Sequence, residues 1–236
     1  MKTRTFFTVL FGIIGPLVCI FLDPIVFRFD LADPPLGFSS PYLGDYQPFA
    51  YAAIALSCAL LIVHLAGISF PPALHVAVAG GLLASAVFAL ALGVVLLPYS
   101  IVGIFILIGL LGFTPFFTSW MYARAGLAEF RGAQGVPRRP LLALAGALTF
   151  FTIASGFHLA VHHSLTQALD ALNSPSAESR TTSITTIRRW DYLFGHQRLI
   201  AAHRQSRSEA HRRALADAYQ TLTNRDLEAD LQRAND

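Results

Sequence analysis

The fold is decided by the stretch ALHVAVAGGLLASAVFALALGVVLLPYSIVGIFILIGLLGFTPFFTSWMY, residues 73–122, which contains no Asp, Glu, Lys or Arg. As one α-helix it would be about 75 Å long, whereas the hydrocarbon core of a bilayer is about 30 Å thick. Pro98 lies near its middle, and proline removes a backbone donor and disfavours helix in the preceding residue. We therefore predict two antiparallel membrane helices, residues 73–97 and 99–122.

Three further apolar stretches, residues 6–27, 49–70 and 141–163, are each long enough to cross a bilayer as a helix. Helix is the expected structure because backbone polar groups in hydrocarbon must be paired within their own segment. The first stretch is too long for a cleaved signal peptide and has no small-x-small site after it, so we interpret it as a retained span. The sequence thus predicts an all-α polytopic bundle of about five transmembrane helices.

Charge divides the chain into two parts. Residues 1–163 contain seven Lys or Arg and five acids, whereas residues 164–236 contain ten Arg and nine acids. A water-soluble core could not absorb the apolar runs of the first part, so we predict a transmembrane domain over 1–163 and a soluble helical tail over 164–236. The net charge of +3 comes mostly from residues that flank the spans, and it does not indicate nucleic-acid binding.

Basic residues in the short connections predict the orientation of the spans. The N-terminus carries Lys2 and Arg4, and the connection after the fourth predicted span carries four arginines, the last being Arg138 and Arg139. Both segments are therefore expected in the cytoplasm, and a fifth crossing would leave the tail outside it. Because one basic residue in 17 is Lys and Ala and Gly are abundant, the composition favours a bacterial cytoplasmic membrane.

Small residues recur at every fourth position of the third predicted span, and this spacing stacks them on one face of a helix. The positions are Ala73, Ala77, Gly81, Ser85, Ala89 and Gly93. Helices in lipid associate through close backbone approach at such residues. We predict a packing seam, formed within the chain or with a partner protein; an alanine-rich composition producing the stripe by chance is the alternative.

Ionisable residues within or beside the spans are the candidates for chemistry. His158 and His162 lie one helical turn apart, and Asp23 is expected at a similar depth near the outer surface. We favour a structural or interfacial role for these histidines. The alternative is a proton or metal site that also includes His163, with a metal or haem edge bound at His158 and His162. His64 and His75 flank a Pro-Pro turn near the opposite surface, where a structural role is favoured.

The tail contains two stretches that align with offsets of 30 to 32 residues, LDALNSPSAESRTTSITTI (169–187) and LIAAHRQSRSEAHRRALADAY (199–219). In the first, Ser174 and Pro175 are expected to open a helix, as N-cap and first helical residue. This copy resembles a HEAT-type helical repeat unit, in which a short turn with Ser-Pro and an acid-x-Arg joins two helices. The resemblance implies a protein-binding surface without an enzymatic role.

The sequence contains no phosphate-binding Gly loop, nucleophile elbow, CxxC or HExxH motif, so we do not expect an enzyme. We predict a non-catalytic, membrane-anchored interaction or assembly component whose partners are the lipid bilayer and either another protein or further copies of itself. The alternative is a small transporter or channel, or a metal- or haem-binding redox subunit that uses the outer Asp and His residues. No resident cofactor is expected under the first hypothesis.

Overall fold

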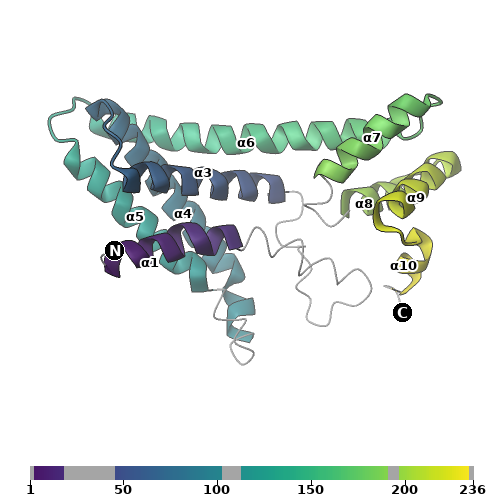
Figure 1. Ribbon diagram of the computed structural model, residues 1–236, viewed down its shortest axis with the longest axis horizontal. Helices are drawn as coiled ribbons and strands as arrows, with labels where there is room; N and C mark the ends of the chain where they lie inside the picture. The colour runs from purple at the N-terminus through teal and green to yellow at the C-terminus, as the bar shows by residue number, and fades with distance from the viewer. Residues whose placement is uncertain (1–2, 19–45, 103–112, 191–196, 234–236) are drawn as a thin grey trace. The chain divides into compact units, whose positions relative to one another are not determined.

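A computed structural model of the protein describes residues 3–18, 46–102, 113–190 and 197–233. Every regular element in these segments is a helix (Figure 1). The all-α fold class is therefore confirmed for the described part of the chain. Asp23 lies outside the described residues.

The chain divides into two compact units. The first, called the apolar bundle here, is drawn from Met1–Ile20 and Pro48–Phe157, and the second, called the C-terminal unit, from Phe21–Gln47 and His158–Asp236. The helices that contribute to the apolar bundle are α1 (Thr3–Val9), the π-helix η1 (Leu10–Ile14), α3 (Gln47–Ala66), α4 (Pro72–Val102), α5 (Thr114–Gly132) and the first part of α6 (Arg139–Ala171). The predicted domain boundary after residue 163 falls inside α6.

Three helices are long and apolar enough to cross a membrane, and they cover Pro48–Ala66, Pro72–Val94 and Arg139–Ala171. This is fewer than the five predicted spans. The first predicted span is described only as far as residue 18, as a shorter apolar helix, Thr5–Val18. Of the fourth predicted span, residues 103–112 lie outside the described residues. Its last part belongs to α5, which begins at Thr114 and continues past the predicted end to include Arg124, Glu129 and Arg131.

The predicted break at Pro98 is wrong. Helix α4 continues through Pro98, and its described part ends at Val102. Proline deletes one helical hydrogen bond, but a chain that left the helix in hydrocarbon would expose several unpaired backbone groups. Continuing the helix with one bond missing is therefore the less costly solution at this position.

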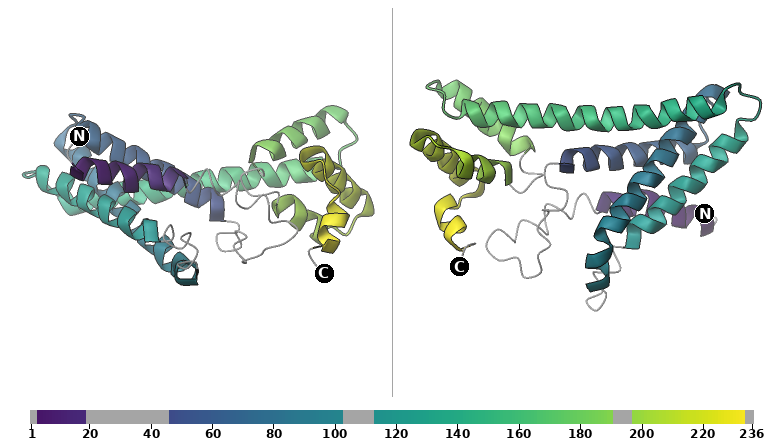
Figure 2. Two further views of the ribbon diagram at one scale, coloured as in Figure 1. Left: turned by 60° about the horizontal axis from the view of Figure 1, so that its bottom comes forward. Right: turned by 180° about the vertical axis from the view of Figure 1, so that it is seen from behind.

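Helices α4 and α5 lie side by side (Figures 1 and 2), with a core that Leu61 of α3, Leu82 and Tyr122 fill. On another side of α4, the backbone of α6 approaches so closely that a Cβ on Gly80 would collide with the Ala143 carbonyl. The reciprocal contact brings Gly146 against the carbonyl of Ala77. Glycine is required at both crossings because the helix backbones touch there.

Large apolar side chains remain exposed along the α6 part of the bundle, among them Leu141, Leu144, Leu148 and Ile153. Water would penalise such a surface, since each exposed leucine forfeits about 2 kcal/mol of burial free energy. Lipid imposes no such cost. The exposed face therefore agrees with α6 being one of the three helices suited to a membrane.

The C-terminal unit consists of the end of α6 with α7 (Ala177–Trp190), α8 (Gln197–Gln205), α9 (Glu209–Thr223) and α10 (Leu227–Arg233). Its buried core is apolar and contains Leu169, Leu172, Ile187, Leu199, Leu215, Tyr219 and Leu227. The last turns of α6 thus belong to this core, whereas Phe150 and Ala154, earlier in the same helix, belong to the core of the apolar bundle.

Helix α7 begins two residues later than predicted. Its first residue is Ala177, and the Ser176 hydroxyl accepts a hydrogen bond from the Ser179 amide at 3.4 Å. The Ser174 hydroxyl accepts from the Ser176 amide instead, at 3.3 Å. Ser174 and Pro175 therefore form the turn that precedes the helix, and Ser176 is its cap.

Candidate functional site

Two histidines singled out from the sequence, His158 and His162, lie on α6 within the C-terminal unit. Their rings stack with centroids 6.2 Å apart, and the ring of Tyr46 stacks on His158 at 5.8 Å. His163 is exposed on the same helix. The structure therefore brings the first two together with an aromatic partner, while the relation of Asp23 to them lies outside the described residues.

The state of His162 follows from its partner, Arg198. The guanidinium group of Arg198 lies within hydrogen-bond distance of His162 Nδ1. Arginine can only donate, so this nitrogen accepts and the imidazole is neutral with its hydrogen on Nε2. Within the described segments, no three His, Cys, Asp or Glu side chains gather where one metal ion would reach them all. A metal or haem at this pair stays a prediction.

A second constellation, called the bundle-end cluster here, consists of His64, His75 and Glu129. The end of α3 supplies His64, the start of α4 supplies His75, and α5 supplies Glu129. His64 Nδ1 lies 2.6 Å from Oε1 of the carboxylate, and His75 Nδ1 lies 2.7 Å from Oε2. One carboxylate thus joins the ends of three helices of the apolar bundle.

The hydrogen positions in the bundle-end cluster follow from which groups can donate. An ionised carboxylate only accepts, so both Nδ1 atoms carry hydrogens. His75 Nε2 in turn accepts from the backbone amide of Phe70 at 3.3 Å, which makes His75 neutral. Because both rings direct their Nδ1 atoms at the same carboxylate, their Nε2 atoms point away from it. The two imidazoles are therefore not arranged to chelate one ion.

Local backbone geometry positions His64. Helix α3 ends at Ala66, four residues before the predicted limit, because Gly67 adopts a left-handed conformation with φ of +60°. The Gly67 amide donates to the carbonyl of His64 at 3.2 Å. This ending holds the imidazole beside the Pro-Pro turn, across from His75.

Sequence reasoning missed Glu129, which entered only as one of the five acids of residues 1–163. The signal was nevertheless present, since Tyr122, Ala125, Gly126 and Glu129 follow the i, i+3, i+4, i+7 spacing of one helical face. The first three are buried in the structure. Continuing this face beyond the predicted end of the span would have placed the carboxylate toward the other helices.

The predicted seam on α4 lies largely inside the apolar bundle. Gly81, Ser85, Ala89 and Gly93 are buried, whereas Ala73 is exposed. A Cβ on Gly81 would meet Leu60 of α3 at 2.8 Å. The Ser85 hydroxyl donates back to the carbonyl of Gly81 at 2.9 Å. These seam residues therefore pack against other helices of the chain, and Ala77 contributes the carbonyl that touches Gly146.

The π-helix η1 is held by hydroxyl groups of α5. Tyr122 donates to the carbonyl of Gly12 at 2.7 Å, and Thr118 donates to the carbonyl of Phe11 at 2.7 Å. Cys58 Sγ lies 3.7 Å from the same Gly12 oxygen. A π turn interrupts the α-helical ladder and leaves carbonyls open to outside donors. The two α5 hydroxyls satisfy them in the apolar interior.

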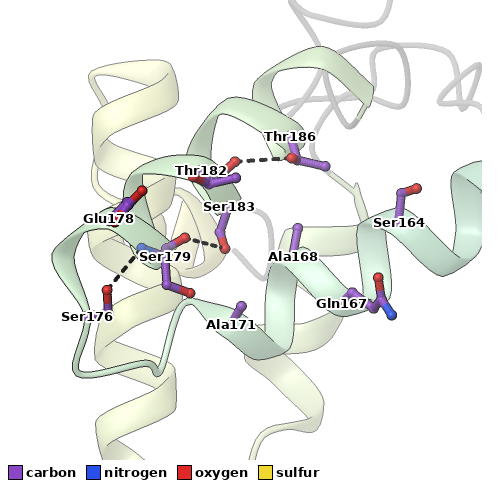
Figure 3. A pocket seen from close by; sticks show the side chains of 10 residues that line it. All are labelled: Ser164, Gln167, Ala168, Ala171, Ser176, Glu178, Ser179, Thr182, Ser183 and Thr186. Carbon is purple, nitrogen blue, oxygen red and sulfur yellow. Dashed lines mark hydrogen bonds between the residues drawn. The ribbon is translucent and has the colours of Figure 1, made fainter.

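An open groove with a volume of about 530 Å³ lies between the end of α6 and α7 (Figure 3). Its lining is dominated by polar side chains and comprises Ser164, Gln167, Ala168, Ala171, Ser176, Glu178, Ser179, Thr182, Ser183 and Thr186. Hydroxyls of α7 donate within their own helix, Ser183 to the carbonyl of Ser179 at 2.9 Å and Thr186 to that of Thr182 at 3.0 Å. Sequence reasoning pointed to a binding surface in this region without identifying the groove.

Compared with models of known protein families, with curated proteins and with solved structures, the chain has no significant match.

Proposed function

We propose that the chain is a membrane-anchored interaction component whose C-terminal unit binds another protein at the groove between α6 and α7. The observation that carries the proposal is this 530 Å³ groove, built on a helical unit that has its own buried core. The apolar bundle, with its three helices suited to a membrane, would serve as the anchor.

The chemistry of the groove indicates what it would bind. Because Ser183 and Thr186 donate their hydrogens to carbonyls of α7, their oxygens offer lone pairs to the groove. The carboxylate of Glu178 adds a further acceptor and a negative charge. An acceptor-rich groove favours a protein segment rich in donors, with Arg, Lys, Asn or Gln side chains.

We also propose five crossings with a cytoplasmic N-terminus and an extracytoplasmic C-terminal unit. Support comes from the bundle-end cluster, which joins the end of α3, the start of α4 and α5. Arg139, at the start of α6, donates to the Phe130 carbonyl at 3.4 Å and therefore lies at the same end of the bundle. Arginines concentrate there, as they do on the cytoplasmic side of membrane proteins. A crossing by α6 then takes the C-terminal unit to the opposite side.

The interaction is tested with a photo-crosslinking amino acid at Thr182, which lines the groove and is exposed. The matched control carries it at Arg213 of α9, whose side chain is 77% exposed in the same unit. In native membranes we expect one discrete adduct from position 182 and none from position 213. Glu178→Lys should abolish this adduct, because the added positive charge would repel the donor side chains of the partner. No adduct at position 182, or equal adducts at both, would refute the proposal.

Reporter fusions test the topology separately. An enzyme that works only outside the cytoplasm should be active when fused after Asp236, and one that works only in the cytoplasm should be inactive there. The opposite result would place the C-terminal unit in the cytoplasm and overturn the five-span arrangement. The photo-crosslinking experiment does not depend on this outcome.

A further inference from the structure

The bundle-end cluster offers a function that does not depend on the groove. Its members lie at helix ends beside the turn between α3 and α4 and are partly exposed, with 24% of the His64 side chain, 29% of His75 and 14% of Glu129 exposed. Protons from water therefore reach a carboxylate that ties three helices together. Imidazole is the side chain whose charge changes most readily near neutral pH.

The two histidines differ in how they can accept a proton. His64 makes its contact through Nδ1, and within the described residues no group donates to its Nε2. A proton can bind there while the Nδ1–H bond to Glu129 remains and becomes charge-assisted. His75 uses both nitrogens, since Nδ1 donates to Glu129 and Nε2 accepts from the Phe70 amide. A proton on His75 Nε2 must displace that amide.

We propose that the bundle-end cluster is a proton-binding site that accepts its first proton at His64 Nε2 and its second at His75 Nε2. The first proton converts the His64–Glu129 contact into an ion pair and tightens the junction of α3 with α5. The second breaks the bond between the Phe70 amide and His75 and so frees this amide from the start of α4. The site thereby couples proton concentration to the connection between α3 and α4.

The charged groups around the cluster agree with this order. Helices α3 and α4 contribute the two histidines, and α5 contributes the carboxylate. From α6, the guanidinium of Arg139 lies 5.3 Å from the Phe130 ring centroid, next to Glu129 in the sequence. In the described segments, no further acid or base forms an ion pair with these three residues. Without added protons the cluster carries one negative charge, and a second proton would make it positive, which opposes that step.

The order is tested by nitrogen NMR of histidine side chains in the full chain, labelled with ¹⁵N and embedded in lipid, with signals assigned through single His→Gln variants. At alkaline pH we expect both cluster histidines to carry the hydrogen on Nδ1. On acidification the imidazolium signal of His64 should appear before that of His75. The exposed His163 provides a reference that lacks the carboxylate. An Nε2–H form of His75 at alkaline pH, or protonation of His75 before His64, would overturn the proposal.

Release of the turn is measured by hydrogen exchange of the Phe70 amide across the same pH range. Its protection relative to the Leu141 amide, which donates to Arg138 at 3.0 Å in another turn, should fall about tenfold or more when His75 protonates. A constant protection ratio would contradict the release. Glu129→Gln leaves one accepting oxygen in place of two, so at most one histidine should keep its Nδ1–H bond to residue 129. Glu209→Gln on the exposed face of α9 should leave both bonds unchanged. The two measurements on the unaltered chain decide the question even if Glu129→Gln fails to fold.

Discussion

The carbonyl of Ala143 on α6 occupies the place where a side chain would begin on Gly80 of α4. One turn earlier in α4 and one turn later in α6, Gly146 lies almost as close to the Ala77 carbonyl. The two helix backbones therefore touch over a complete crossing. Any Cβ at these glycines must push backbone against backbone, which cannot rotate out of the way as a flexible side chain can.

Gly146→Ala is therefore expected to destabilise the apolar bundle by about 1–3 kcal/mol, the usual cost of overpacking. Gly156→Ala is the matched control on the same helix, because a Cβ there meets nothing within 4 Å. It should be neutral or stabilising, since alanine favours helix over glycine by up to about 1 kcal/mol. Thermal unfolding in one detergent compares the two variants. Equal midpoints would refute the close crossing.

The contact between Tyr122 and η1 leads to a second expectation. Tyr122→Phe keeps the ring but removes the hydroxyl that donates to Gly12, leaving a buried carbonyl with a weaker partner in Cys58. The loss should destabilise the bundle by about 1–3 kcal/mol. Tyr46→Phe, at a residue 68% exposed, should have no comparable effect. The additional substitution Cys58→Ala should cost more in Tyr122→Phe than in the unaltered chain, and strict additivity would argue against a shared acceptor.

Gly67 tests the conformation that ends α3. In Gly67→Ala the new Cβ meets no atom within 4 Å, so only its left-handed backbone, with φ of +60°, opposes the substitution. We expect a loss of about 1 kcal/mol in stability and a displaced His64. Gly132→Ala, at the end of α5, also has open space but ordinary helical φ, and it should be tolerated. Unfolding midpoints and the His64 NMR signal report the two effects, and a tolerated Gly67→Ala would contradict this reading of the turn.

Much of the helical architecture was predictable because apolar length is a local property of the sequence. Residues 49–70, 73–97 and 141–163 each overlap a helix suited to a membrane. The prediction failed at Pro98, where a local rule about proline is overridden by the absence of water to satisfy a broken helix. The prediction also ended the span at residue 122, where the apolar stretch stops. Helix α5 instead continues to Gly132 and includes the charged residues Arg124 and Glu129.

The bundle-end cluster shows why sites are harder to predict than spans. His64 and His75 are adjacent to one turn, and the sequence identified both. Their partner Glu129 is 65 residues from the first and 54 from the second, so the contact depends on how α5 lies against α3 and α4. No local pattern in the sequence encodes a contact between residues so far apart in the chain. The groove between α6 and α7 likewise depends on the angle at which α7 packs against α6.

The last expectation concerns Tyr219 in the core of the C-terminal unit. Its hydroxyl donates to Asp230 Oδ2 at 3.1 Å. Burial, followed by the negative charge of Asp230 and this hydrogen bond, raises the pKa of Tyr219 to about 12 from the ordinary 10.0. The folded chain thus keeps the phenolic proton between pH 10 and 12, where the unfolded chain loses it. The resulting stabilisation is complete below pH 10 and disappears as the pH rises to 12, by at most about 1.4 kcal/mol per pH unit.

Tyr219→Phe isolates this contribution. The variant loses the hydrogen bond and should be less stable than the unaltered chain by about 1 kcal/mol at pH 8, and that difference should shrink above pH 10 and change sign before pH 12. Asp230→Asn, which removes the charge but keeps an acceptor, should let Tyr219 ionise at lower pH, and the ultraviolet absorbance of tyrosinate reports this directly. Full-length protein in detergent serves for both measurements. Parallel stability curves for Tyr219→Phe and the unaltered chain from pH 8 to 12 would show that Tyr219 ionises as readily in the folded chain as in the unfolded one.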